Sequence, residues 1–93
     1  MPNLQSAKKR MRIEEKRRAR NKAVKSTVRT YVTRARTAIA ANADAPATLE
    51  QIRETISKLD SAVTKGVIHK NNAARRKSRL MARLHAAQAA HSA

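Results

Sequence analysis

Apolar residues recur at helical spacing between residues 24 and 39. The stripe follows the i, i+3/i+4 rule and consists of Val24, Val28, Tyr31, Val32, Ala35, Ala38 and Ile39. Upstream, the same arc of a helix is occupied by Arg10, Arg17 and Arg20. The pattern predicts a helix over about residues 5–43, or about 58 Å at 1.5 Å per residue. We expect its C-terminal half to pack on a core and its N-terminal half to project as a basic arm.

A second apolar pattern predicts a helix over about residues 48–65. Its positions repeat at intervals of three and four, the spacing of a bundle seam, and are Leu49, Ile52, Ile56, Leu59 and Val63. The segment from Asn42 to Pro46 separates it from the first helix. Thr48 and Gln51 have capping-box spacing, with Asp44 as a rival cap that would put Pro46 in the first turn. Gly66 is expected to end this helix as a left-handed cap.

A third helix is predicted over about residues 68–90, so all three predicted elements are helices. Its apolar positions include Ile68, Ala73, Leu80, Met81, Leu84 and Ala87. Two short connections imply antiparallel neighbours. The prediction is therefore an all-α chain with a single domain at 1–93: a three-helix bundle with an unusually long, basic first helix that projects beyond it. Because many core positions are Ala, we expect the free protein to be marginally stable.

Charge is the main feature of the composition. The 93 residues include 22 Lys and Arg against 6 Asp and Glu, a formal net charge of +16. Between Lys8 and Lys22 there are nine basic residues and only two acidic ones. On a helix these cations face nearly every direction, so this stretch cannot dock along a protein core. Their mutual repulsion should fray the segment in the free protein, and a nucleic acid is the partner that would relieve it.

Several classes of function are not expected. The chain has no Cys, so it has no disulfide framework or thiolate metal site, and its three dispersed His do not make a metal site either. It has no apolar run long enough to cross a membrane and no hydrophobic signal region, so a cytoplasmic location is expected. Tyr31 is the only aromatic residue, which argues against a base-stacking platform. We find no Gly-rich phosphate loop and no nucleophile–base set, so neither an enzyme nor a cofactor is predicted.

Two blocks of sequence resemble a known family. The first comprises Ser6-Ala7-Lys8-Lys9-Arg10, Glu15-Lys16, Asn21, Lys25-Ser26 and Arg29-Thr30. The second runs Lys65-Gly66-Val67-Ile68-His69-Lys70-Asn71 and continues through Ala73-Ala74-Arg75, Lys77-Ser78 and Leu80. Together they resemble, in the same order, the bacterial small-subunit ribosomal protein S20 family, and the block from Lys65 to Asn71 is the specific part.

The resemblance implies both a fold and a function. It implies a three-helix bundle with a long first helix that is a structural constituent of the small ribosomal subunit. Such a protein binds 16S ribosomal RNA directly, bridges its 5′ domain and its long penultimate helix, and stabilises RNA folding early in 30S assembly. It implies few or no protein contacts, no membrane, no small-molecule substrate and no homo-oligomer.

The predicted RNA-binding residues form three groups. The arm contributes Lys8, Lys9, Arg10, Arg12, Lys16, Arg17, Arg18, Arg20 and Lys22. The middle of the first helix contributes Asn21, Lys25, Ser26, Arg29 and Thr30, and the third segment contributes His69, Lys70, Asn71, Arg75, Arg76, Lys77, Ser78 and Arg79. Contacts to phosphate position a protein without reading bases, so specificity should come from RNA shape.

Some of these residues have a simpler interpretation. The short polar residues, such as Ser26, Thr30 and Ser78, could be solvated surface groups. His69 could be a helix cap or a packing residue instead of an RNA contact, and His85 and His91 are expected to be solvent-exposed.

Two other classes of protein fit the charge less well. A DNA-compacting, histone-like protein is one alternative, since charge alone does not distinguish DNA from RNA. A membrane-active amphipathic peptide is the other, but it would need Trp, Phe or Leu on an apolar face that here is mostly Val and Ala.

Overall fold

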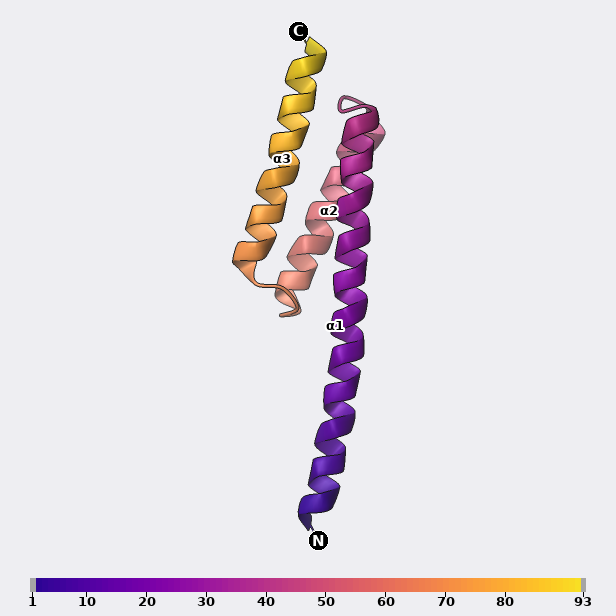
Figure 1. The fold of residues 1–93 in the computed structure, drawn as a ribbon, viewed down its shortest axis with the longest axis vertical. Helices are drawn as coiled ribbons and strands as arrows, with labels where there is room; N and C mark the ends of the chain where they lie inside the picture. Colours follow the sequence, from indigo (N-terminus) through magenta and orange to yellow (C-terminus); the bar gives the residue numbers. More distant parts are fainter. Residues whose placement is uncertain (1, 93) are drawn as a thin grey trace.

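The computed structural model describes the backbone of residues 2–92 and the side chains of residues 4–90. It contains three α-helices, α1 (Pro2–Ala41), α2 (Pro46–Thr64) and α3 (Lys70–Ser92), and no strand among the described residues. α2 returns antiparallel to the C-terminal half of α1, and α3 reverses again beside them (Figure 1). The N-terminal half of α1 extends beyond the other helices, and the molecule measures 73 × 21 × 14 Å. The predicted all-α bundle with a long first helix is confirmed.

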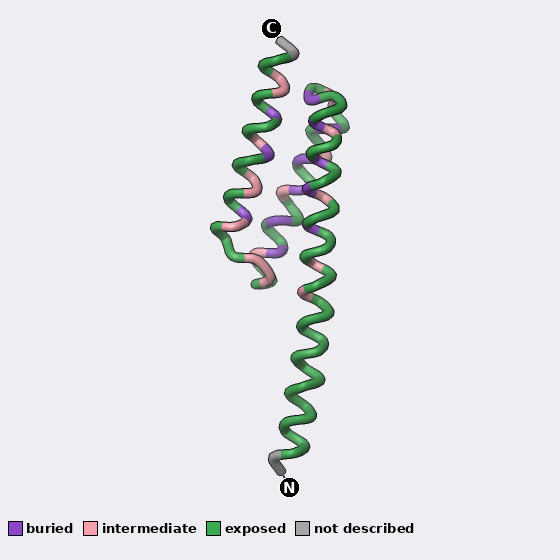
Figure 2. Tube along the Cα trace, viewed as in Figure 1, coloured by how far each residue is buried: buried purple, intermediate pink, exposed green. Residues whose placement is uncertain are grey.

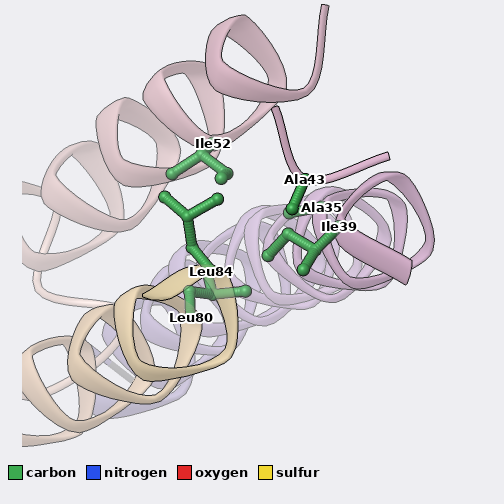
Figure 3. Close-up of a cluster of buried hydrophobic side chains, with 6 residues drawn as sticks. All are labelled: Ala35, Ile39, Ala43, Ile52, Leu80 and Leu84. Atoms are coloured by element: carbon green, nitrogen blue, oxygen red, sulfur yellow. The ribbon is translucent and has the colours of Figure 1, made fainter. Parts of the chain in front are cut away.

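The core occupies only the part of the molecule where all three helices run side by side (Figure 2). The buried cluster nearer the α1–α2 connection contains Ala35, Ile39, Ala43, Ile52, Leu80 and Leu84 (Figure 3). The other contains Val28, Val32, Leu59, Ala62 and Ala73. Every predicted stripe position of α1 is buried or half-buried, which confirms that the core begins at Val24.

Part of the buried face of α2 lies one residue earlier in the chain than the predicted seam. Leu49 is 43% exposed, so its assignment to the seam was wrong, whereas Ile52 and Leu59 are buried as expected. Thr48 and Thr55 are buried on the inner face instead. Sequence spacing alone favoured the larger apolar side chain, because it does not show which polar groups find hydrogen-bond partners.

The two buried threonines tie α2 to the backbone of α1. The Thr48 hydroxyl donates to the Asn42 carbonyl at 2.6 Å and lies 3.3 Å from the Ala38 carbonyl. The Thr55 hydroxyl lies 3.1 Å from the Tyr31 carbonyl of α1 and 2.8 Å from the Gln51 carbonyl of its own helix. Thr48 therefore adds a side-chain donor to two carbonyls at the C-terminal end of α1, which also accept from the Asn42 and Ala45 N–H groups.

The start of α2 corrects the cap predicted for it. The N-cap residue is Ala45, which makes no side-chain cap bond, so neither the Thr48 capping box nor the Asp44 cap forms. Pro46 occupies the first turn, where its missing N–H costs nothing.

The end of α2 agrees with the prediction. Gly66 adopts a φ of 73°, the left-handed region that favours glycine. Its N–H donates to the Val63 carbonyl at 2.9 Å, and the Val67 N–H donates to the Ala62 carbonyl at 3.0 Å. These two bonds form a Schellman motif, which ends the helix and turns the chain towards α3.

The corrected seam yields a paired prediction for two leucines of α2. Leu59→Ala removes a fully buried side chain and should lower the free energy of unfolding by about 2–4 kcal/mol. Leu49→Ala is the matched control and should change it by less than about 0.5 kcal/mol, because that side chain is already half in water. Urea unfolding followed by circular dichroism measures both. Equal losses would contradict the placement of the buried face.

The hydroxyl of Thr48 gives a second test of the packing. Thr48→Val keeps the shape of the side chain but leaves the Asn42 carbonyl without this donor, which should cost about 1–2 kcal/mol. Thr37→Val is the control, because the exposed Thr37 hydroxyl bonds only within α1, to the Thr33 carbonyl. Both variants can be compared by the same unfolding measurement, and a Thr48→Val protein as stable as the control would refute the proposed tie.

Candidate nucleic-acid interface

The projecting arm of α1 is exposed on all sides. Every described side chain from residue 4 to residue 20 is exposed, and the first half-buried position is Asn21 (Figure 2). Neither Glu14 nor Glu15 pairs with a cation among the described side chains. The predicted arm cations are therefore uncompensated and accessible from several directions, as a polyanion-binding element requires.

The basic surface continues from the arm onto the packed half of α1. A hollow beside this helix is lined by Arg18, Lys22, Lys25, Ser26 and Arg29. Thr30, predicted as an RNA contact, donates its hydroxyl hydrogen to the Ser26 carbonyl at 3.0 Å. A phosphate oxygen accepts but does not donate, so this hydroxyl would have to leave its helix bond to bind one.

His69 caps the N-terminus of α3. Its backbone carbonyl accepts from the Asn72 and Ala73 N–H groups, and its Nδ1 accepts from the Asn71 N–H at 3.1 Å. An accepting Nδ1 carries no hydrogen, so the neutral ring holds its hydrogen on Nε2. Since the side chain is exposed, Nε2–H remains available to an acceptor outside the protein. The helix-cap interpretation is thus what the structure shows, and it leaves an RNA contact possible at the other nitrogen.

The remaining predicted residues of the third segment fall into two groups: those held by partners within the protein and those that are exposed. Lys77 forms an ion pair with Asp60 of α2, so it is half-buried and partly neutralised. Arg76 is held by a bond from its Nε to the Asn72 Oδ1 at 2.8 Å. Lys70, Asn71, Arg75, Ser78 and Arg79 are exposed.

The structure adds two residues that sequence analysis missed. Arg36 of α1 and Arg83 of α3 line a pocket together with the predicted Arg75, Arg76 and Arg79. The sequence held one clue, because positions 76, 79 and 83 share a helix face at i, i+3 and i+7. Arg36 had no such clue, since only the packing of α3 beside α1 brings it to the pocket.

Other kinds of site find no support in the described part of the chain. No group of His, Asp or Glu among the described residues could hold a metal ion. Within the part of the chain that the structure describes, none of the helices is long and apolar enough to cross a membrane. His85 is exposed as expected, and His91 lies outside the described side chains.

These features together define a class of protein: a small helical bundle with an unpacked, strongly basic helix of the kind that suits a polyanionic partner. Residues 2–85 match the family described as Ribosomal protein S20, and the chain belongs to that family. The family is structural and non-enzymatic.

Close relatives support the same assignment over the full length. The small ribosomal subunit protein bS20 of Thermobifida fusca is 48% identical over 93 residues, which is all of both chains. The protein of the same name from Shouchella clausii is 52% identical over 84 residues, or 90% of this chain and 94% of the relative. That of Natranaerobius thermophilus is 48% identical over 83 residues, covering 89% and 93%.

The cap at His69 can be tested without RNA. His69→Asn should keep the free energy of unfolding within about 0.5 kcal/mol of wild type, because Asn is a good N-cap. His69→Ala should lower it by about 0.5–2 kcal/mol, since the Asn71 N–H loses its acceptor. Urea unfolding of the free protein measures the free energy of unfolding of both variants. Equal stability of the two variants would exclude the capping role.

Proposed function

We propose that this chain is a structural constituent of the small ribosomal subunit and binds 16S ribosomal RNA directly through the basic face of α1 and the start of α3. The family assignment supports the first part of this proposal. The observation that carries the second is the arm, where nine Lys and Arg side chains stand on a helix with no packing partner. A constituent of the bacterial subunit resides with the ribosome in the cytoplasm.

Phosphate contacts by the arm would act on several RNA helices at once. Because the arm is charged on all sides, RNA helices can approach it from different directions, and each neutralises a different set of cations. Arg side chains provide forked donors that match phosphate oxygens, and Lys side chains provide point charges. Holding separate RNA helices against one rod stabilises their relative arrangement, which is how the protein would assist folding during 30S assembly.

RNA binding would also complete the folding of the protein. Every described side chain of α1 before Asn21 is exposed, and isolated helices of this length are marginal in water. We infer that the arm frays in the free protein, while the packed bundle holds, and that RNA orders it. The acidic residues Glu50, Glu54 and Asp60 lie on exposed positions of α2. This helix would therefore face away from the RNA backbone, and we propose a single-domain monomer with few protein contacts.

Charge reversal on the arm tests the binding mechanism. Arg17→Glu and Arg18→Glu, each alone and together, should weaken binding to small-subunit ribosomal RNA and reduce the slope of log K against log salt by about 0.7–0.9 per lost contact. Arg53→Glu is the matched control, because it makes the same charge change on an exposed position of α2. Filter binding across a salt series measures the slopes. Unchanged slopes in the arm variants would rule out phosphate contacts by the arm.

A competition experiment separates this function from the DNA-compacting alternative. Ribosomal RNA should outcompete duplex DNA by several orders of magnitude, because selectivity comes from RNA shape in addition to charge. Equal competition by the two nucleic acids would instead favour the DNA-compacting, histone-like alternative.

A further inference from the structure

A pocket between α1 and α3 gathers five arginines around an apolar floor. The arginines are Arg36, Arg75, Arg76, Arg79 and Arg83, and the floor is formed by Val32 and Leu80. The pocket has a volume of about 240 Å³. One water molecule needs only about 15 Å³ by a comparable measure, so the pocket has room for a group of several heavy atoms.

The positive charge of this pocket has no internal counterpart. The ion pairs among the described side chains join Arg53 to Glu50 and Lys77 to Asp60, and neither pair lies in the pocket. Arg76 bonds to Asn72, and the other four arginines have no hydrogen-bond or ion-pair partner in the described part of the protein. Guanidinium groups gathered in this way favour an anion with several oxygens, which each can bind through a fork of two N–H groups.

A line of hollows connects the pocket to the arm. The hollow on α1 that includes Arg18 shares Lys25 and Arg29 with a second hollow between α1 and α3. That second hollow shares Asn72 and Arg76 with the arginine pocket. From position 18 to position 36 the track covers about 27 Å of helix at 1.5 Å per residue. Its extended form suits a chain of phosphates better than a single ion.

The same arginines oppose the docking of α3 when they are unpaired. α2 is tied to the α1 backbone by the hydroxyls of Thr48 and Thr55, whereas none of the identified hydrogen bonds joins α3 to α1. α3 is held mainly by the burial of Ala73, Leu80 and Leu84 and by the ion pair from Lys77 to Asp60. Cations on both sides of the α1–α3 boundary repel each other, so an anion between them would stabilise the docked state.

We propose that the arginine pocket is a phosphate-binding site, occupied by the RNA backbone that follows the track from the arm, and that its occupation holds α3 against α1. The RNA occupant rests on the proposed function, but the phosphate site does not. In this arrangement one stretch of RNA backbone runs along the track into the pocket, and its phosphates strengthen the docking of α3 in a bundle that already holds in the free protein. No aromatic or acidic side chain lines the pocket, so its lining offers guanidinium groups to an anion and no carboxylate to a cation.

The test compares two double variants of the full chain that each lose two charges. Arg79→Gln with Arg83→Gln removes two of the pocket's four exposed cations, and Arg10→Gln with Arg17→Gln removes two arm cations outside the track. Melting is followed by circular dichroism in sodium chloride and in sodium pyrophosphate at equal ionic strength. At a tenfold excess over Kd, a bound ligand raises the folded-to-unfolded ratio about elevenfold, or roughly 5–10 °C in Tm.

We expect pyrophosphate to raise the Tm of the wild type and of the arm variant, but not of the pocket variant. The pocket variant should be at least as stable as wild type in chloride, because it has lost repulsion and no contact. Hydrogen exchange should show the gain in protection at the amides of α3. An equal gain in the pocket variant, or none in the wild type, would overturn the proposal.

Ribosomal RNA binding then identifies the source of the phosphate. If RNA occupies the pocket, the pocket variant loses about 1.4–1.8 from the salt slope, for two contacts. If the pocket variant no longer responds to pyrophosphate but keeps the wild-type salt slope for RNA binding, RNA does not occupy the pocket. The pocket would then be a site for a free oligophosphate. If the wild type fails to select ribosomal RNA over DNA, the proposed function fails, whereas the pyrophosphate response still decides the site.

Discussion

The cost of burying charge determines the shape of this molecule. A helix can pack only where a continuous apolar stripe faces its neighbour, and on α1 that stripe begins at Val24. Upstream, the arc that would continue it carries arginines, and burying them without partners is prohibitively unfavourable. The bundle therefore ends where the stripe ends, and the rest of α1 is left in solvent (Figure 2). The projecting arm and the small core are two results of one constraint.

Within the bundle the three helices are held with different strength. The hydroxyls of Thr48 and Thr55 on α2 reach the Ala38 and Tyr31 carbonyls of α1, and these two helices contribute most of the cluster around Leu59. α3 contributes fewer buried side chains, and the arginine pocket lies along its boundary with α1, beside the packed Leu80 and Leu84. A firm hairpin with a loosely attached third helix suits a protein whose partner supplies the missing counter-charges. Under the proposed function, stability in the complex would depend on the RNA as well as on the protein core.

The candidate site shows how many interface residues can be proposed from residue type alone. The arm residues were proposed because charge on every side of a helix has few structural explanations, and the structure leaves all of them exposed, while their contact with RNA stays a prediction. Lys77 was assigned to the RNA with its neighbours, yet it pairs with Asp60, because helix rotation turns it towards α2. Arg36 and Arg83 were missed for the converse reason, since their proximity depends on the packing of α3 beside α1. Composition cannot distinguish a basic residue that faces a partner from one that faces an acidic neighbour.

The sequence by itself determined the helices and the point on α1 where the core begins, and it predicted a polyanionic partner. These properties follow from local spacing: the apolar period, the glycine at position 66 with its positive φ, and the run of cations from Lys8 to Lys22. Only the tertiary structure decided that Thr48 and Thr55, and not Leu49, face the core. It also decided which arginines meet between α1 and α3. Both depend on the rotation of one helix against another, which is set by side-chain packing and hydrogen bonds between residues far apart in the chain.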